Sequence, residues 1–181
     1  MVSKELALGI RLYKNINLSC TDEILKLDFS KASKEGIIGN NEFKIDYETR
    51  STLSIDVPHS ISSDNRFTKI FRETFDPIEQ NYMSLFGINL RSHNPYKILK
   101  YNVGDKFSKH MDDGGGNFRR VSTVYYLNDD YEGGELCFPQ FDIKLKPEMG
   151  DMVIFPSSYV YSHSVNPVIS GNRFSIASWL K

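Results

Sequence analysis

The sequence of 181 residues predicts a mostly β fold of the sandwich, barrel or jelly-roll type, with helices confined to the N-terminal half. After residue 95 the chain is a series of short runs rich in β-branched and aromatic residues, separated by turn sequences such as NVGD, NDDYEGG and ISGN. No helical periodicity interrupts this series, which indicates antiparallel sheets. The runs cover residues 96–103, 106–111, 121–128, 134–138, 142–146, 151–155, 160–165 and 173–179.

The N-terminal part, residues 1–95, mixes strand and helix signals and is expected to support that core. Strands are predicted at 10–13 and within 43–58, a short helix with Ser19 or Thr21 as its cap lies between them, and 30–42 is predicted as loop.

A longer helix is predicted from Asp64 onward, because apolar residues recur there at three- and four-residue steps. Pro77 is expected to interrupt or kink this helix, and Gly87 to end it. The helix would pack on an outer face of the sheets, so residues 1–181 form one domain: a support region, 1–95, and a β core, 96–181.

The amino-acid composition indicates a globular protein and gives no sign of a nucleic-acid-binding or membrane protein. Apolar residues make up 40% and charged residues 25%, which suits a globular core, and a net charge of -1 gives no reason to expect nucleic acid or an anionic membrane as partner. No apolar run is long enough to span a bilayer, and the N-terminus does not resemble a signal peptide. Cys20 and Cys137 form no disulfide framework, so we expect free thiols and a cytoplasmic location.

The stretch HMDDGGG, residues 110–116, is the first candidate site. Side chains two apart on a strand point to the same face, so His110 and Asp112 lie together while Met111 and Asp113 take the other face. A histidine and a carboxylate at the rim of a strand can hold a metal, although the pair alone is a common pattern. The glycines that follow allow the chain to turn away from the strand.

A second histidine and an arginine strengthen the pattern. His163 lies on one strand, and after the turn ISGN the next strand begins with Arg173, which shares a face with Trp179. Two histidines and one carboxylate form the facial triad of non-haem Fe(II) oxygenases. An arginine beside such a triad can hold a carboxylate through a bidentate fork.

The order HxD, distal His and Arg resembles the Fe(II)/2-oxoglutarate dioxygenases, whose core is a double-stranded β-helix. The segments YNVGDKFSKHMD, VYYLNDDYEGGELCF and HSVNPVISGNRFSIASW resemble the prolyl 4-hydroxylases, and most closely the hypoxia-sensing type. Residues 96–180 carry this resemblance, while the N-terminal half is similar only in the order of its elements. One departure is that Arg173 follows His163 by ten residues, one more than in the hypoxia-sensing type, and a longer turn at 170–172 would absorb it.

The resemblance implies a role for each matching residue. Iron would be bound by the triad, the distal carboxylate of 2-oxoglutarate by an arginine assisted by a tyrosine hydroxyl, and a second tyrosine would line the pocket near the metal. A tryptophan and a second arginine would contact a peptide substrate. The triad is His110, Asp112 and His163, and the arginine is Arg173. The assisting tyrosine is Tyr126 and the tyrosine near the metal is Tyr101. The tryptophan and the second arginine are Trp179 and Arg119.

The implied activity is 4-hydroxylation of a proline in a peptide or protein, using Fe(II), 2-oxoglutarate and O₂, releasing succinate and CO₂, with ascorbate in a supporting role. The carboxylate of Asp112 argues against halogenation, which needs a small residue there. Residues 49–60 or the loop 113–118 could form a substrate lid. His59 and His93 are expected to be hydrogen-bonded structural residues.

Other functions stay open. The same chemistry could act on a free amino acid or another small molecule, and the fold could serve a non-catalytic jelly-roll binding protein. An alkylated base is disfavoured, because no second arginine follows Arg173 on its strand. The oligomeric state does not follow from the sequence, and a monomer is compatible with it.

Overall fold

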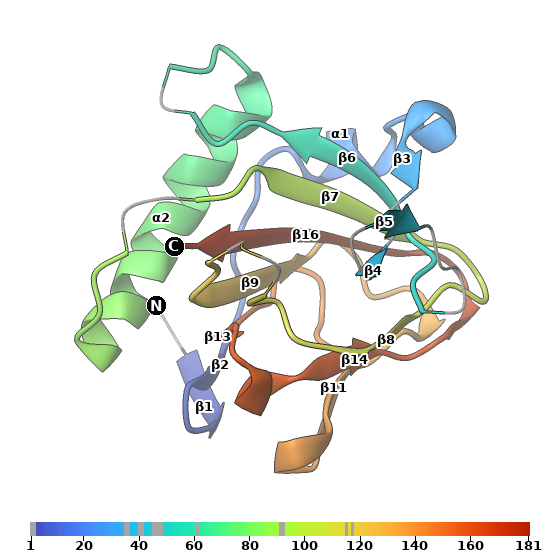
Figure 1. The fold of residues 1–181 in the computed structure, drawn as a ribbon. Coiled ribbons are helices and arrows are strands. Elements are labelled where there is room, and N and C mark those ends of the chain that lie inside the picture. Colours follow the sequence, from blue (N-terminus) through green and yellow to red (C-terminus); the bar gives the residue numbers. More distant parts are fainter. Residues whose placement is uncertain are drawn as a thin grey trace.

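Two antiparallel sheets face each other, and helices cover the outer side of the larger one (Figure 1). The computed structural model describes residues 3–34, 37–39, 42–44, 49–60, 62–90, 93–114, 116 and 118–181. The larger sheet has the order β1-β2-β13-β9-β16-β7-β6-β3. Its strands are β1 (Ser3–Ala7), β2 (Ile10–Tyr13), β13 (Met152–Pro156), β9 (Val121–Tyr126), β16 (Arg173–Leu180), β7 (Tyr96–Tyr101), β6 (Leu53–Val57) and β3 (Ser33–Lys34).

The smaller sheet carries the two histidines of the predicted triad. Its order is β12-β11-β14-β8, and two further strand pairs, β10 with β15 and β4 with β5, lie outside both sheets. The bounds are β12 (Ile143–Leu145), β11 (Leu136–Phe138), β14 (His163–Val165), β8 (Phe107–His110), β10 (Glu132–Gly133), β15 (Val168–Ser170), β4 (Ile37–Gly39) and β5 (Glu42–Lys44). The predicted mostly β fold with helices in the N-terminal half is confirmed.

Strand alternation divides the core into an inner and an outer cluster. On β16, Ala177 and Trp179 point inward between the sheets, whereas Ile176 and Leu180 point outward toward the helices. Because β16 lies between β9 and β7, it is hydrogen-bonded on both sides. Side chains at its inner positions are therefore held rigidly.

The helix α2 (Arg66–Phe86) lies beside the larger sheet (Figure 1), and its apolar stripe packs against the outer cluster. The side chain of Asn65 caps its first turn by accepting from the N–H of Thr68, and Gly87 ends it in the left-handed conformation, as predicted. The expected interruption at Pro77 is wrong. The helix continues through this residue, which is exposed.

Several local predictions need correction. The helix α1 (Thr21–Leu25) has Cys20 at its N-cap and no side-chain cap, because the Thr21 hydroxyl bonds to the carbonyl of Leu18 instead. Where it is described, the predicted loop 30–42 contains the end of η1 (Phe29–Lys31), the strands β3 and β4, and the first residue of β5. The predicted strand 160–165 begins as a helical turn, η3 (Tyr159–Tyr161), and a second such turn, η2 (Pro139–Phe141), follows β11.

The segment 49–60 does not form a free lid. Its middle is β6, which pairs with β7 on one side and β3 on the other. Its first residues pair with the smaller sheet through Ser108 N–H to the carbonyl of Thr49 at 2.8 Å. The other candidate lid, 113–118, lies partly outside the described residues. Among the described residues, no helix is long and apolar enough to cross a membrane.

Candidate metal centre

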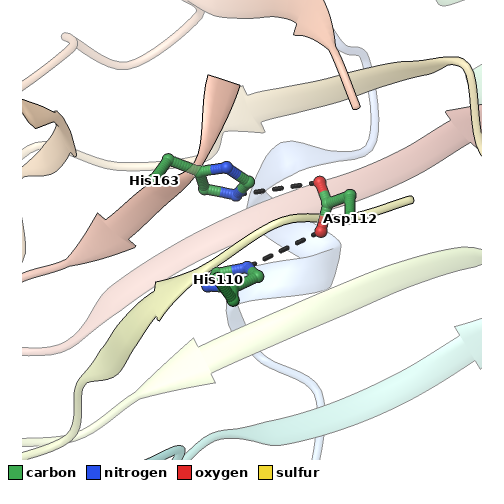
Figure 2. Close-up of side chains that lie close together, drawn as sticks. All are labelled: His110, Asp112 and His163. Atoms are coloured by element: carbon green, nitrogen blue, oxygen red, sulfur yellow. Dashed lines mark ion pairs between the residues drawn. The ribbon is translucent and has the colours of Figure 1, made fainter. Parts of the chain in front are cut away.

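His110, Asp112 and His163 converge between the sheets, as Figure 2 shows. His110 ends β8 and faces His163, its partner in register on β14. The Nε2 atom of His110 lies 3.6 Å from Oδ1 of Asp112, and the Nε2 atom of His163 lies 3.7 Å from Oδ2. One ligand atom from each residue lies within 4.8 Å of the others, which is the spacing that a bound metal ion needs.

The backbone fixes the orientation of both imidazole rings. Nδ1 of His110 lies 2.8 Å from the carbonyl of Ser108, and Nδ1 of His163 lies 3.1 Å from the carbonyl of Tyr161. Each Nδ1–H therefore donates to a carbonyl, and the lone pair is left on Nε2, which faces the centre. Phe107 stacks on the His110 ring at 3.5 Å between centroids and limits its rotation.

Asp112 is held by bonds that the strand pattern alone does not reveal. The β8 strand ends at His110, and the N–H groups of Asp112 and Asp113 both donate to the carbonyl of Ser157. The hydroxyl of Ser122 donates to Oδ2 of Asp112 at 2.6 Å. Asp113 turns away toward Arg120, 3.8 Å distant. The choice of Asp112 over Asp113 from strand alternation agrees with this geometry.

The protonation states suit a metal. Burial would raise the pKa of Asp112, but the His163 and His110 imidazoles and the Ser122 hydroxyl outweigh it, so its pKa lies well below the usual range. Burial lowers the pKa of His163 to about 4. At pH 7 the site therefore presents a carboxylate and a neutral imidazole, the forms that bind Fe(II).

Arg173 is fully buried between the sheets, with 1% of its surface exposed. Its guanidinium lies over the rings of Tyr101 and Tyr126, at 4.8 and 4.9 Å, and its Nη1 donates to the hydroxyl of Ser175. Burial would lower the pKa of Arg173, but three tyrosines, the third being Tyr131, keep it raised.

Polar atoms around Arg173 are available to an anion. Its Nε atom and the hydroxyls of Tyr126 and Tyr131 have no hydrogen-bond partner within the described part of the chain. Burial raises the pKa of Tyr126 to about 12, so this hydroxyl keeps its proton and can donate. A buried cation with free donors beside it fits the carboxylate of a cosubstrate.

Trp179 and Arg119 lie together, with the guanidinium 3.8 Å from the ring centroid. Trp179 pairs in register with Ser122, whose hydroxyl donates to Asp112. Trp179 and Arg119 therefore border the metal centre. Tyr101, the last residue of β7, lies against Arg173.

Sequence reasoning missed Ser122, Phe107 and Tyr131. Ser122 could have been found, because it shares a strand face with Tyr126 on β9. Phe107 touches His110 although it is three residues away in sequence, and Tyr131 reaches Arg173 from the turn NDDYEGG. Neither contact has a signal in the local pattern.

Residues 96–181 match the family model described as the 2OG-Fe(II) oxygenase superfamily. A PKHD-type hydroxylase of Prochlorococcus marinus is 29% identical over 176 residues, which cover 93% of this chain and 73% of the relative. Prolyl 3-hydroxylase 2 of Homo sapiens is 40% identical over 67 residues, 34% of this chain, and the matched part spans only 10% of that longer protein.

Two solved structures share the fold. A prolyl-4-hydroxylase of Pseudomonas putida has a TM-score of 0.77 and 18% identity, covering 96% of this chain and 92% of that one. A prolyl hydroxylase of Trichoplax adhaerens, solved in complex with a peptide fragment of the hypoxia inducible factor oxygen degradation domain, has a TM-score of 0.74 and 20% identity, covering 95% and 83%.

Together, these matches support a 2OG-Fe(II) oxygenase of the prolyl hydroxylase type, with the family model matched over residues 96–181. The predicted jelly-roll core is confirmed, and Fe(II), 2-oxoglutarate and O₂ are the cofactors that the family and the His-Asp-His site support.

Proposed function

We propose that this protein is a peptidyl-proline hydroxylase that depends on Fe(II) and 2-oxoglutarate and modifies C4 of the ring. The observation that carries the proposal is the combination of the triad with a buried cation in the same space between the sheets. When bound, Fe(II) would activate O₂, the oxidant, so that one oxygen atom would enter the proline ring and the other the succinate formed with CO₂ from 2-oxoglutarate.

The residues have separate roles in this proposal. His110, Asp112 and His163 hold Fe(II). Arg173 pairs with the distal carboxylate of 2-oxoglutarate, and the Tyr126 hydroxyl donates to the same group. The apolar side chains of the inner cluster keep water away, which strengthens that ion pair.

Trp179 and Arg119 are proposed to contact the substrate, and Tyr101 to line the pocket beside Arg173. A peptide is the favoured substrate class, because the structure from Trichoplax adhaerens is a complex with a peptide fragment. The match to prolyl 3-hydroxylase 2 makes C3 of proline the second candidate position. A free amino acid is the rival substrate.

The experiment incubates the Fe(II)-loaded protein with proline-containing peptides, 2-oxoglutarate and O₂. We expect succinate and a product 16 Da heavier, whose position of hydroxylation is read by fragmentation and NMR. Asp112→Ala should abolish both products, while Asp113→Ala, one residue away and turned toward Arg120, should retain them. Circular dichroism checks that both variants fold.

The outcomes separate the alternatives. Hydroxylation of free proline but of no peptide would refute the peptide assignment while leaving the metal site intact. Tight binding of metal and 2-oxoglutarate without succinate would indicate a binding protein. Full activity of Asp112→Ala would contradict the metal assignment itself.

A further inference from the structure

A second cavity, of about 630 Å³, lies on the other side of the larger sheet from the metal centre. One wall is α2, and the others are the residues before this helix and those before β7. Its lining combines polar groups with apolar walls. The lining residues are Pro58, His59, Ser60, Arg72, Asp76, Glu79, Gln80, Met83, Leu90, His93 and Pro95.

Glu79 is the deepest polar group of this cavity, with 2% of its surface exposed. Neither of its carboxyl oxygens has a hydrogen-bond partner among the described residues. The nearest candidate, Nε2 of His93, lies 3.7 Å from Oε2, which is too long for a hydrogen bond. An unsatisfied buried carboxyl is costly to stability unless a partner from outside binds it.

Asp76 adds a second unsatisfied oxygen one helical turn away. Its Oδ2 pairs with Nη2 of Arg72 at 3.3 Å, whereas Oδ1 has no partner in the described chain. Pro58, Met83 and the other apolar walls lie around these oxygens. The residues that line the cavity thus carry buried, unpartnered acceptor atoms beside apolar surface.

A metal ion does not fit this arrangement. His59 and His93 are stacked at 3.9 Å between centroids with only 4° between their planes. Their lone pairs therefore lie in parallel planes and cannot converge on one ion. Among the described residues, the only compact group of metal-binding side chains is the triad of the catalytic site.

An anion fits less well than a cation. Burial lowers the pKa values of His59 and His93 to about 4, so both imidazoles are neutral at pH 7. An anion would therefore have to use Arg72, whose Nη1 has no partner among the described residues but whose Nη2 already pairs with Asp76. Burial, followed by the nearby Asp76, raises the pKa of Glu79 to about 8, so ionising it for a cation costs only about 10-fold. The other polar groups facing Glu79 are Arg72 on α2 and Tyr96 beneath it.

We propose that this cavity binds an organic cation, a guanidinium or ammonium group on a short apolar stem, through the carboxylates of Glu79 and Asp76. Such a group satisfies the unpartnered oxygens, and its stem packs against the apolar walls. The same chemistry is carried by a free amine or guanidine and by the side chain of a basic residue in a peptide. The site is separate from the metal centre and does not depend on the proposed activity.

The test uses n-butylguanidine as the free cation, N-acetyl-arginine methylamide as the peptide-borne one, and n-butylurea as a neutral probe of the same shape. Calorimetry at pH 7 in two buffers of different ionisation enthalpy measures affinity and proton release. We expect a cationic probe to bind, with close to one proton released from Glu79 per site, and n-butylurea not to bind. The stronger of the two cations identifies the source.

Glu79→Gln keeps the shape of the side chain and removes its charge, and should weaken binding at least 10-fold, on the order of one lost charged hydrogen bond. Glu73→Gln is the matched control, because it makes the same substitution at an exposed position of α2. Both variants should keep the wild-type circular dichroism spectrum and 2-oxoglutarate turnover.

Three results would overturn the proposal. The first is that neither cationic probe binds the wild-type protein at millimolar concentration, at pH 7 or at pH 8.5. The second is binding that Glu79→Gln leaves unchanged. The third is preferential binding of acetate, which would assign the cavity to anions.

Discussion

Arg173→Met separates a role in cosubstrate binding from a role in stability. The side chain of methionine fills similar volume but removes the charge. In the wild-type protein the guanidinium is buried, and the groups that act on its pKa are tyrosines rather than carboxylates. A buried cation with no ionic partner in the described part of the chain is costly, and this cost disappears in the variant.

The stability terms nearly cancel. The variant loses the hydrogen bond to Ser175, about 1.5–3 kcal/mol for a charged donor, and two contacts with the rings of Tyr101 and Tyr126, about 0.5–2 kcal/mol each. Removing the buried charge also removes its desolvation penalty, which stabilises the folded variant by several kcal/mol. We therefore expect the free energy of unfolding to change by no more than about 2 kcal/mol.

The affinity for 2-oxoglutarate should fall much further. Removing one partner of a buried, hydrogen-bonded ion pair costs about 2–5 kcal/mol, which corresponds to about 30-fold to several thousand-fold in Kd. Calorimetry on protein loaded with Mn(II) measures this Kd without turnover, and urea unfolding measures stability. Arg120→Met, at a largely exposed position, is the control and should change neither value.

The refuting result is specific. If Arg173→Met lost more than about 3 kcal/mol of stability while its Kd for 2-oxoglutarate stayed at the wild-type value, Arg173 would be a structural residue. The carboxylate pocket would then have to lie elsewhere.

Two further predictions concern the hydroxyl that holds the metal ligand and the carboxyl of the second cavity. Ser122→Ala removes the 2.6 Å bond to Asp112 and should weaken Fe(II) binding about 10- to 100-fold in a competition titration. Ser178→Ala should not, because the Ser178 hydroxyl is buried and has no partner among the described residues. Glu79 has a folded pKa raised to about 8, so the unfolded chain ionises first and stability is lost as pH rises from about 4.5 to 8. The free energy of unfolding of Glu79→Gln should therefore equal that of the wild type at pH 4 and exceed it at pH 8.5, by up to about 5 kcal/mol. An equal gap at both pH values would contradict this sign.

Local patterns predicted the strands after residue 95 and placed the triad, because alternation on a strand is a property of the backbone. They predicted Asp112 for a reason that is only partly correct, since β8 ends before it and the carbonyl of Ser157 fixes its direction. Contacts of this kind join residues about 45 apart in sequence, and no periodicity encodes them. The role of each site residue stays a prediction until the variants are measured.

The second cavity was missed for a different reason. His59 and His93 were expected to be hydrogen-bonded structural residues, and one ring nitrogen of each, Nε2 of the first and Nδ1 of the second, has no partner in the described structure. They meet only because the chain before α2 and the chain before β7 both return to the same end of the larger sheet. Their stacking is a consequence of topology and has no signal in either segment.

Both sites contain an ionisable residue at a buried position of a strand or helix whose other buried positions are mostly apolar. Arg173 occupies an inward position of β16 that it shares with Ala177 and Trp179, and Glu79 follows Ile78 on the buried side of α2. An apolar residue at either position would pack without the cost of burying an ionisable group. At most positions of a globular domain, apolar residues are buried and polar residues are exposed. Exceptions that lower stability are few, and they occur where a bound partner can stabilise the buried ionisable group. A carboxylate would stabilise the buried charge of Arg173, and a cation would stabilise that of Glu79. The two residues lie on opposite sides of the larger sheet.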